Sequence, residues 1–359
     1  MIKSYNKIGI LFILLLFPLL SSAQSPNEEP DIDVKEIVLG HIGDSYEWHI
    51  TSFGEKELRI DLPVIVHSPV SGWHIFSSAR LHEPDAEYEG LRIATEGEHK
   101  GKIVERQADG SDLRPFDLSI TKTVAGLLIN SILLLILILC TAHWYKNKKA
   151  DSPAPKGFVG LLEMAVSSLM DGLIKPCVGK NYQRFAPYLL TAFFFILINN
   201  MMGLIPIFPG GANVTGNIAV ALVLAFATFL AINLFGSKTY WKDIFWPDVP
   251  VWLKIPIPII PVIEFVGVLT KPFALMIRLF ANVMAGHAVI LSLACIIFVT
   301  VKMGAAINSS MTVVSVLFSI FMNCLELLVA FLQAYVFTML SAVFIGLAQE
   351  NGTAEKTQN

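Results

Sequence analysis

The chain has 359 residues, of which 54% are hydrophobic and 15% are charged, and its mean hydropathy is +0.62. These values exclude an ordinary soluble domain and indicate a protein that crosses a membrane several times. The formal net charge of -3 gives no sign of a nucleic-acid partner, but it conceals a local bias, because residues 24–120 hold about twenty acidic side chains against about nine basic ones.

Residues 1–23 are typical of a secretory signal peptide. Lys3 and Lys7 precede an apolar run, residues 8–20, and the small residues 21–23 offer a cleavage site. An apolar run of about 13 residues is short for a membrane span, although an uncleaved anchor stays an alternative. In either case the residues after 23 are expected to lie outside the cytoplasm.

Residues 24–121 are predicted to form a small β-rich domain outside the cytoplasm. Runs at residues 47–51, 58–66 and 72–76 alternate in polarity as half-buried strands do, and turn residues such as Ser68-Pro69 and Asp109-Gly110 separate strands. Six of the eight histidines lie here without any H-x-H or H-x-x-x-H pair, so no metal site is predicted. All four cysteines follow residue 121, so no disulfide framework is predicted either.

The first membrane span of the mature chain is predicted at residues 124–144. Lys146, Lys148 and Lys149 follow it, and by the positive-inside rule this end lies in the cytoplasm, which agrees with an exported N-terminal domain. Residues 150–184 are then cytoplasmic. Within them the amphipathic stretch 158–174 could lie on the membrane surface or pack on a partner.

Two further spans are predicted at residues 186–207 and 215–235, joined by a short glycine-rich outer loop. Lys238, Lys242 and Lys254 mark the next loop as cytoplasmic. The aromatic residues of this loop are typical of an interfacial segment; they are Tyr240, Trp241, Phe245, Trp246 and Trp252.

Two apolar segments, residues 256–300 and 305–349, are each about 45 residues long, twice the length that a perpendicular span needs. One interpretation divides each into two spans, with a turn at residues 271–278. The other keeps each as one long, steeply tilted helix, and it is favoured because residues 275–282 contain good helix formers and no turn chemistry. Gly304 and Asn308 suit an outer connection between the two helices.

The predicted fold is therefore an all-α polytopic membrane domain, residues 122–350, with about five membrane helices in the mature chain, the last two long and tilted. A β-rich domain outside the cytoplasm precedes it, and a cytoplasmic tail, residues 351–359, follows it.

Arg278 is the most costly polar residue in the two long segments. A guanidinium keeps its proton in proteins, so Arg278 places a permanent cation at membrane depth, at a cost of about 3 kcal/mol or more. The first segment also carries Glu264, Lys271, Asn282 and His287, and the second carries Asn323, Glu326 and Gln333.

Facing residues in an antiparallel hairpin have residue numbers with a nearly constant sum. Arg278 with Gln333 and His287 with Glu326 satisfy this to within two, so the pairs are predicted at two levels of one helical hairpin, about 3 Å apart in rise. The predicted orientation puts His287 and Glu326 on the outer side of Arg278 and Glu264 on the cytoplasmic side.

These positions predict a proton path in two halves. His287 and Glu326 can exchange protons near neutral pH and could line an outer aqueous half-channel, and Glu264 could line an inner one. Arg278 would repel a proton moving straight through and lower the pKa of a carboxylate carried past on a partner protein. Gln333 could hydrogen-bond the guanidinium.

Plainer interpretations stay open for several of these positions. Glu264 could be solvated at the cytoplasmic interface, and Lys271 could snorkel or pair with a neighbour. His287 and Glu326 could form a buried pair with a structural role only.

Three short motifs stand in order along residues 125–350. They are residues 200–206, Asn-Met-Met-Gly-Leu-Ile-Pro; Lys271-Pro272 followed by residues 278–287, Arg-Leu-Phe-Ala-Asn-Val-Met-Ala-Gly-His; and Gln333-Ala334. Together they resemble the signature of subunit a of the F-type ATP synthases. The resemblance does not extend to residues 24–120.

The resemblance implies a multi-pass subunit of the cell inner membrane that conducts protons and has no catalytic role of its own. It implies a periplasmic N-terminal domain and a cytoplasmic C-terminus. Expected partners are a ring of c subunits, whose carboxylates carry the protons, the b subunits of the peripheral stalk, other ATP synthase subunits and membrane lipid. No cofactor and no metal are expected.

The same resemblance assigns roles to residues. The family's essential arginine falls on Arg278, and Asn282 and Gln333 lie close to it. His287 and Glu326 take the places of an inlet Glu and His pair in exchanged order. Glu264 matches a polar position of the cytoplasmic exit.

Two other functions fit parts of the sequence. A secondary transporter or channel with an intramembrane arginine site would usually show inverted repeats, and none is found. An export or scaffold protein would leave Arg278 unexplained. No P-loop sequence occurs, so the chain is not expected to hydrolyse nucleotides itself. The choice between H⁺ and Na⁺ is expected to depend largely on the ring.

Overall fold

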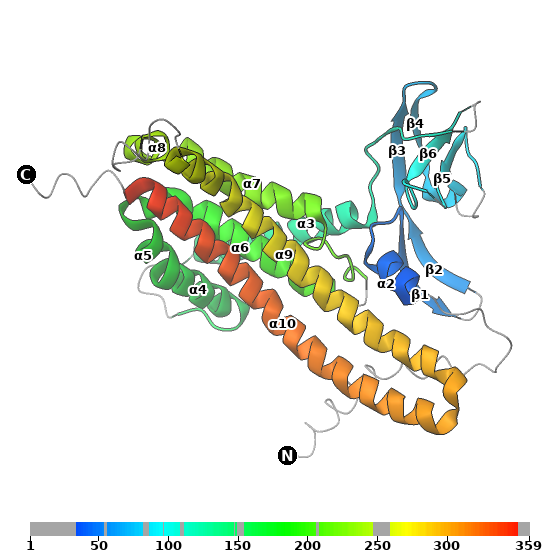
Figure 1. Cartoon of the computed structure of the whole chain (residues 1–359). Coiled ribbons are helices and arrows are strands. Elements are labelled where there is room, and N and C mark those ends of the chain that lie inside the picture. The colour runs from blue at the N-terminus through cyan, green and yellow to red at the C-terminus, as the bar shows by residue number, and fades with distance from the viewer. Residues whose placement is uncertain are drawn as a thin grey trace, which may run out of the picture.

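The computed structural model describes residues 34–53, 56–81, 86–95, 97–107, 111–146, 148, 154–205, 208–246 and 259–350. The predicted signal peptide, the turn at Asp109-Gly110, Trp252, Lys254 and the C-terminal tail lie outside these ranges. Figure 1 shows a helical bundle crossed obliquely by the long helices α9 and α10, with the strands gathered at one end of the bundle and α8 at the other.

The N-terminal part contains short strands in three antiparallel sheets, as its predicted β-rich character requires. The first sheet pairs β1 (Glu47–Phe53) with β2 (Lys56–Asp61); the second has the order β4 (Gly72–Ser77), β3 (Pro63–Ser68), β8 (Phe116–Asp117); the third has the order β5 (Leu91–Ile93), β6 (Ile103–Arg106), β7 (Asp112–Leu113). A helix that the sequence analysis did not predict, α2 (Val34–Ile42), precedes them.

The strand predicted at residues 58–66 is divided in two. β2 ends at Asp61, and β3 begins at Pro63 and pairs with different strands. The break falls here because proline has no N–H with which to continue a ladder. Leu62 instead donates its N–H to Ser78 Oγ at 3.0 Å.

The two three-stranded sheets share one hydrophobic core. Its buried members are Tyr46, Val64, Val66, Phe76, Leu81, Leu91 and Ile103. Tyr46 donates its hydroxyl to Asp117 at 2.5 Å. Burial, together with this carboxylate, raises the pKa of the Tyr46 phenol above its ordinary value, so it is a neutral, hydrogen-bonded part of the core.

The rest of the described chain is mainly helical. The helices are α3 (Lys122–Lys146), α4 (Phe158–Leu169), α5 (Lys175–Val178), α6 (Tyr182–Leu204), α7 (Ile218–Leu234), α8 (Lys238–Phe245), α9 (Ile259–Val299) and α10 (Ala305–Glu350). Among the described residues, four helical stretches are long and apolar enough to cross a membrane, or five if α7 and α8 count as one bent span. The predicted polytopic all-α part is confirmed.

Each of the two long segments is one continuous helix, with 41 residues in α9 and 46 in α10. Pro272 lies inside α9, so the interpretation with a turn at residues 271–278 is wrong. At 1.5 Å per residue these helices are about 60–70 Å long, and tilt is the ordinary way to fit such apolar lengths into a bilayer. Gly304, with φ at +101°, makes the connection, and Asn308 Oδ1 accepts a hydrogen bond from Thr300 at 2.9 Å.

The C-terminal end of the stretch predicted to be amphipathic, residues 158–174, packs against another helix of the chain. It continues from α4 through a π-turn, Met170–Ile174, into α5, which contacts α10. Gly346 of α10 allows this approach, because a Cβ there would lie 1.9 Å from the carbonyl oxygen of Cys177. The exposed apolar side of α4 carries Phe158, Leu161 and Met164.

The N-terminal domain contacts the bundle through α2, which packs on α9, and through Asp44 and Trp48. Asp44 Oδ1 accepts the N–H of Thr123 at 3.0 Å, which caps the first turn of α3. Trp48 of β1 is 3% exposed and packs on Ala212 and Val214 in the loop between α6 and α7. The Trp48 ring also meets Phe208 of this loop edge-on, at 5.2 Å between centroids.

We expect Trp48→Ala to loosen the loop of residues 208–217. Truncating a buried tryptophan typically costs about 3–5 kcal/mol, and here the lost contacts are those that hold the loop. Hydrogen exchange of the loop amides in the purified full chain should therefore rise by about tenfold or more. Leu58→Ala is the control, because Leu58 is an exposed apolar residue of the same domain. Equal exchange in the two variants would contradict the expectation.

Candidate functional site

Four of the six predicted site residues surround one small cavity between α6, α9 and α10. Asn282 and His287 of α9 line it from one side, and Glu326 and Gln333 of α10 from the other, with Asn200 of α6 closing it. The cavity measures about 20 Å³, which is room for about one water molecule. The hairpin of α9 and α10 thus brings together residues that lie far apart in the sequence.

His287 and Glu326 both line this cavity and meet directly, with 2.5 Å between Nδ1 and Oε1. Both side chains are mostly buried. Although the distance is that of an ion pair, neither atom has a well-aligned hydrogen-bond partner among the described residues. The two side chains are therefore in direct contact, without a well-aligned hydrogen bond between them.

Buried polar atoms without a well-aligned hydrogen bond to a described residue concentrate at this cavity. They are His287 Nδ1, both carboxylate oxygens of Glu326 and Gln333 Nε2. Since buried polar groups in proteins are nearly always hydrogen-bonded, a cluster of this kind points to water or a mobile proton as the partner. A water in the cavity could bond the second carboxylate oxygen of Glu326 and Gln333 Nε2.

The sequence suggested a hydrogen bond between Gln333 and Arg278, but Gln333 bonds a different residue in the structure. Its Oε1 accepts a hydrogen bond from Asn282 Nδ2 at 2.8 Å. Asn282 lies one turn beyond Arg278 on the same face of α9. Gln333 is therefore at the level of Asn282, one turn nearer the cavity than predicted.

Arg278 lies outside the cavity, on the exposed surface of α9. Within the described ranges, no residue forms an ion pair or hydrogen bond with it. Three alanines are exposed on the same face: Ala274, Ala281 and Ala285. The cation therefore stands on a surface that another helix could approach closely.

Glu264 and Lys271 lie apart from the cavity. Glu264 is exposed and precedes Arg278 by fourteen residues, or about 21 Å of helix, toward the end of α9 that contacts α8. Lys271 Nζ lies 5.6 Å from the centroid of the Phe344 ring on α10. This contact favours the plainer interpretation of Lys271, in which its stem packs between the long helices.

Asn200 and Thr215 were not predicted to have a role, yet they join the outer loop to the cavity. Thr215 Oγ1 donates to Asn200 Oδ1 at 2.6 Å, and Asn200 Nδ2 donates to the carbonyl of Ala330 at 3.2 Å. The sequence feature that could have indicated a role for Asn200 is the pair of adjacent asparagines, Asn199 and Asn200, inside an apolar helix. The other amide, Asn199, accepts a hydrogen bond from Asn130 of α3 at 2.9 Å.

We expect Gly286→Ala to disturb the His287–Glu326 pair. A Cβ at residue 286 would lie 2.9 Å from Glu326 Oε1, so the carboxylate would have to move. Since a misplacement of about 1 Å can cost up to about a hundredfold in rate, proton transport by the assembled membrane complex should fall several-fold. Gly203→Ala is the control, because its Cβ would meet His287 Nε2 at an ordinary 3.7 Å. Similar rates in both variants would refute the expectation.

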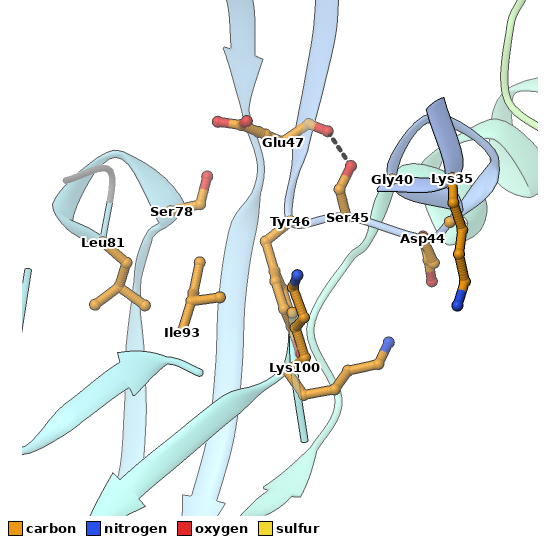
Figure 2. A pocket seen from close by; sticks show the side chains of 13 residues that line it. Lys35, Gly40, Asp44, Ser45, Tyr46, Glu47, Ser78, Leu81, Ile93 and Lys100 are labelled. Carbon is orange, nitrogen blue, oxygen red and sulfur yellow. Dashed lines mark hydrogen bonds between the residues drawn. The ribbon is translucent and has the colours of Figure 1, made fainter. Parts of the chain in front are cut away.

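A larger, open cavity of about 780 Å³ lies in the N-terminal domain and contains none of the predicted residues. Figure 2 shows its wall, to which Lys35, Tyr46, Ile93 and Lys100 contribute side chains and where Ser45 donates to the carbonyl of Glu47. Acidic and basic groups are mixed along it. In the part of the chain that the structure describes, no three His, Cys, Asp or Glu side chains lie close enough to hold a metal ion.

A bundle of membrane-length helices that buries a histidine–glutamate pair and carries an arginine on its surface defines a membrane protein with a polar site between its helices. The family model described as "ATP synthase A chain" matches residues 127–346. The chain therefore belongs to the ATP synthase subunit a family. A second model, described as a domain of unknown function (DUF8433), matches residues 37–120.

Relatives agree with this assignment. The chain is similar to "ATP synthase subunit a" of Chlorobium phaeobacteroides, with 45% identity over 65% of this chain and 66% of the relative. It is similar to "ATP synthase subunit a 2" of Chlorobaculum tepidum, with 45% identity over 65% and 64%. "ATP synthase subunit a" of an Anaeromyxobacter species is 38% identical over 72% and 61%. The chain thus spans 61–66% of the length of these relatives, which is just under two thirds.

Proposed function

We propose that this chain is the stationary, proton-conducting subunit of an F-type ATP synthase and has no catalytic role of its own. In this proposal it lies beside a ring of c subunits in the inner membrane. It offers two aqueous half-channels to the ring carboxylates, and Arg278 separates them. Family membership supports the general role, and the geometry supports the division into two halves.

The observation that carries the proposal is the exposed guanidinium of Arg278. A permanent cation in an apolar helix surface is costly unless an anion compensates for it. No such anion lies among the described residues, and the alanines around Arg278 leave room for a second helix. A carboxylate on a ring helix would supply the missing charge, and the cation would favour loss of its proton.

The cavity at His287 and Glu326 belongs to one half-channel. It lies on the side of Arg278 where the N-terminal domain sits, because a Cβ at Gly203, at the end of α6, would lie 3.7 Å from His287 Nε2, and the following loop packs on Trp48. Protons would pass from this side through the pair to the ring. Asn282 and Gln333 line the step between the pair and Arg278.

Glu264 belongs to the other half-channel in this proposal. It is exposed toward the α8 end of α9, on the far side of Arg278 from the cavity. Lysines of the connections at this end, with the positive-inside rule, support a cytoplasmic location. The N-terminal domain would then be periplasmic, and the b subunits would contact other parts of the bundle.

Disulfide cross-linking tests the contact with the ring. Ala281→Cys, beside Arg278, should cross-link to a cysteine placed next to the ring carboxylate in the assembled complex. The control is Leu135→Cys, an exposed apolar position on α3. Cross-linking of both positions or of neither would defeat the proposal. The four native cysteines, Cys140, Cys177, Cys295 and Cys324, are first replaced by serine.

A further inference from the structure

The sheet β4–β3–β8 has an apolar outer face that no described part of the chain covers. Its outward positions are Pro63, Ile65, His67, Trp73, Ile75, Ser77, Phe116 and Leu118. Four of them are large and highly exposed: Trp73 at 59%, Ile75 at 73%, Phe116 at 64% and Leu118 at 52%. A contiguous exposed patch of this kind marks an interaction site.

Strand pairing joins these residues into one surface. Ile65 lies opposite Ile75, and His67 lies between Trp73 on β4 and Phe116 on β8. The rings of His67 and Trp73 meet at 4.7 Å between centroids. The patch is therefore a continuous face of three strands.

The face carries no charged side chain, although the domain is acidic. Residues 24–120 carry about twenty acidic side chains, yet none of the eight outward positions is charged. An acidic surface is repelled by anionic lipids, so a neutral apolar face is the part of this domain that can approach a bilayer.

The face is continuous with the first membrane helix. Leu118 N–H bonds the carbonyl of Ile65, and Ile120 N–H bonds that of Pro63, so the sheet edge runs almost to Lys122, where α3 begins. Four residues span at most about 14 Å. The exposed apolar side chains of α3 begin at Val124.

The direction of the face also fits a membrane surface. The inner sides of β3 and β4 pack on β5 and β6. Figure 1 shows β5 and β6 on the side of the β3–β4 hairpin away from the helices, and the hairpin runs across the direction of α7. The outward face is thus turned toward the region that the helices span.

We propose that the outer face of the β4–β3–β8 sheet binds the surface of the lipid bilayer. Trp73, Ile75, Phe116 and Leu118 insert at the boundary between headgroups and acyl chains, where tryptophan and other aromatic residues are favoured. Lipid contact then helps to hold the domain in place and, through Trp48, the loop of residues 208–217 beside the cavity.

A fluorescent label at Ile75→Cys tests this proposal. The full chain, with its native cysteines replaced by serine, carries the environment-sensitive fluorophore NBD and is reconstituted into vesicles of phosphatidylethanolamine and phosphatidylglycerol. Since Ile75 is highly exposed, the substitution removes no internal packing. The control is Glu98→Cys, an exposed position in the turn between β5 and β6.

Insertion to a depth of about 5–10 Å should shift the emission at position 75 to the blue, and lipids with brominated acyl chains should quench it at least about twofold. Position 98 should show neither effect. Emission at position 75 that matches position 98 would overturn the proposal. A blue shift without quenching by brominated lipid would also overturn it, because a protein surface would then cover the face.

Discussion

Arg278→Ala is expected to abolish ATP-driven proton pumping in membranes that contain the assembled complex. At about 4 Å and an effective dielectric constant of about 20, a guanidinium favours an ionised carboxylate by about 4 kcal/mol. This corresponds to about three pKa units. Without the cation, a ring carboxylate would release its proton about a thousandfold less readily at this position.

The measurement is acidification of inverted membrane vesicles with ATP, together with passive proton leak after removal of the catalytic sector. Lysine at position 278 keeps the charge without the planar guanidinium fork and is expected to restore only part of the rate. Lys271→Ala is the matched control, because it removes a cation seven residues away that packs on Phe344. Full pumping by Arg278→Ala, or equal loss in Lys271→Ala, would exclude the proposed role of Arg278.

The position of the His287–Glu326 pair could be predicted because helices are regular. Once both segments are taken as single helices in one hairpin, residue numbers determine which residues share a level. The structure places Nδ1 and Oε1 2.5 Å apart, as this argument requires. The importance of Arg278 could also be predicted from the sequence, because the prediction needs only the residue type and the apolar residues around it.

The partner of Gln333 could not be predicted in the same way. Arg278 and Asn282 are one turn apart on one face, and the hairpin argument is accurate only to about two residues. Side-chain length and rotamer then decide which of them meets Gln333, and the structure selects Asn282. Residue numbering alone contains no information on that choice.

Contacts between elements far apart in the sequence were also beyond prediction. Asn200 reaches α10 from α6, and Trp48 reaches the loop of residues 208–217 from β1. Such contacts depend on which helices are lateral neighbours, and a pattern of hydrophobic residues does not specify neighbours. The break of one predicted strand at Pro63 was visible in the sequence, but the alternation on both sides of it suggested continuity.

Exchanging the residues at positions 287 and 326 is expected to restore much of the function that each single exchange destroys. His287→Glu places two carboxylates within about 3 Å of each other, and they cannot both ionise. Glu326→His places two imidazoles there and removes the acid. Each single change should lower ATP-driven pumping by about tenfold or more, since residues in contact couple by about 0.5–3 kcal/mol.

The double variant, His287→Glu with Glu326→His, again has one carboxylate and one imidazole around the same cavity. Because the two residues are coupled, its pumping rate should recover to within about threefold of the original rate. Gly286 leaves space beside position 326 for the new ring. Pumping is measured in inverted vesicles, with the amount of assembled complex as the control. Equal loss in all three variants would show that the two residues act separately, and the proton path on this side of Arg278 would then require a different pair.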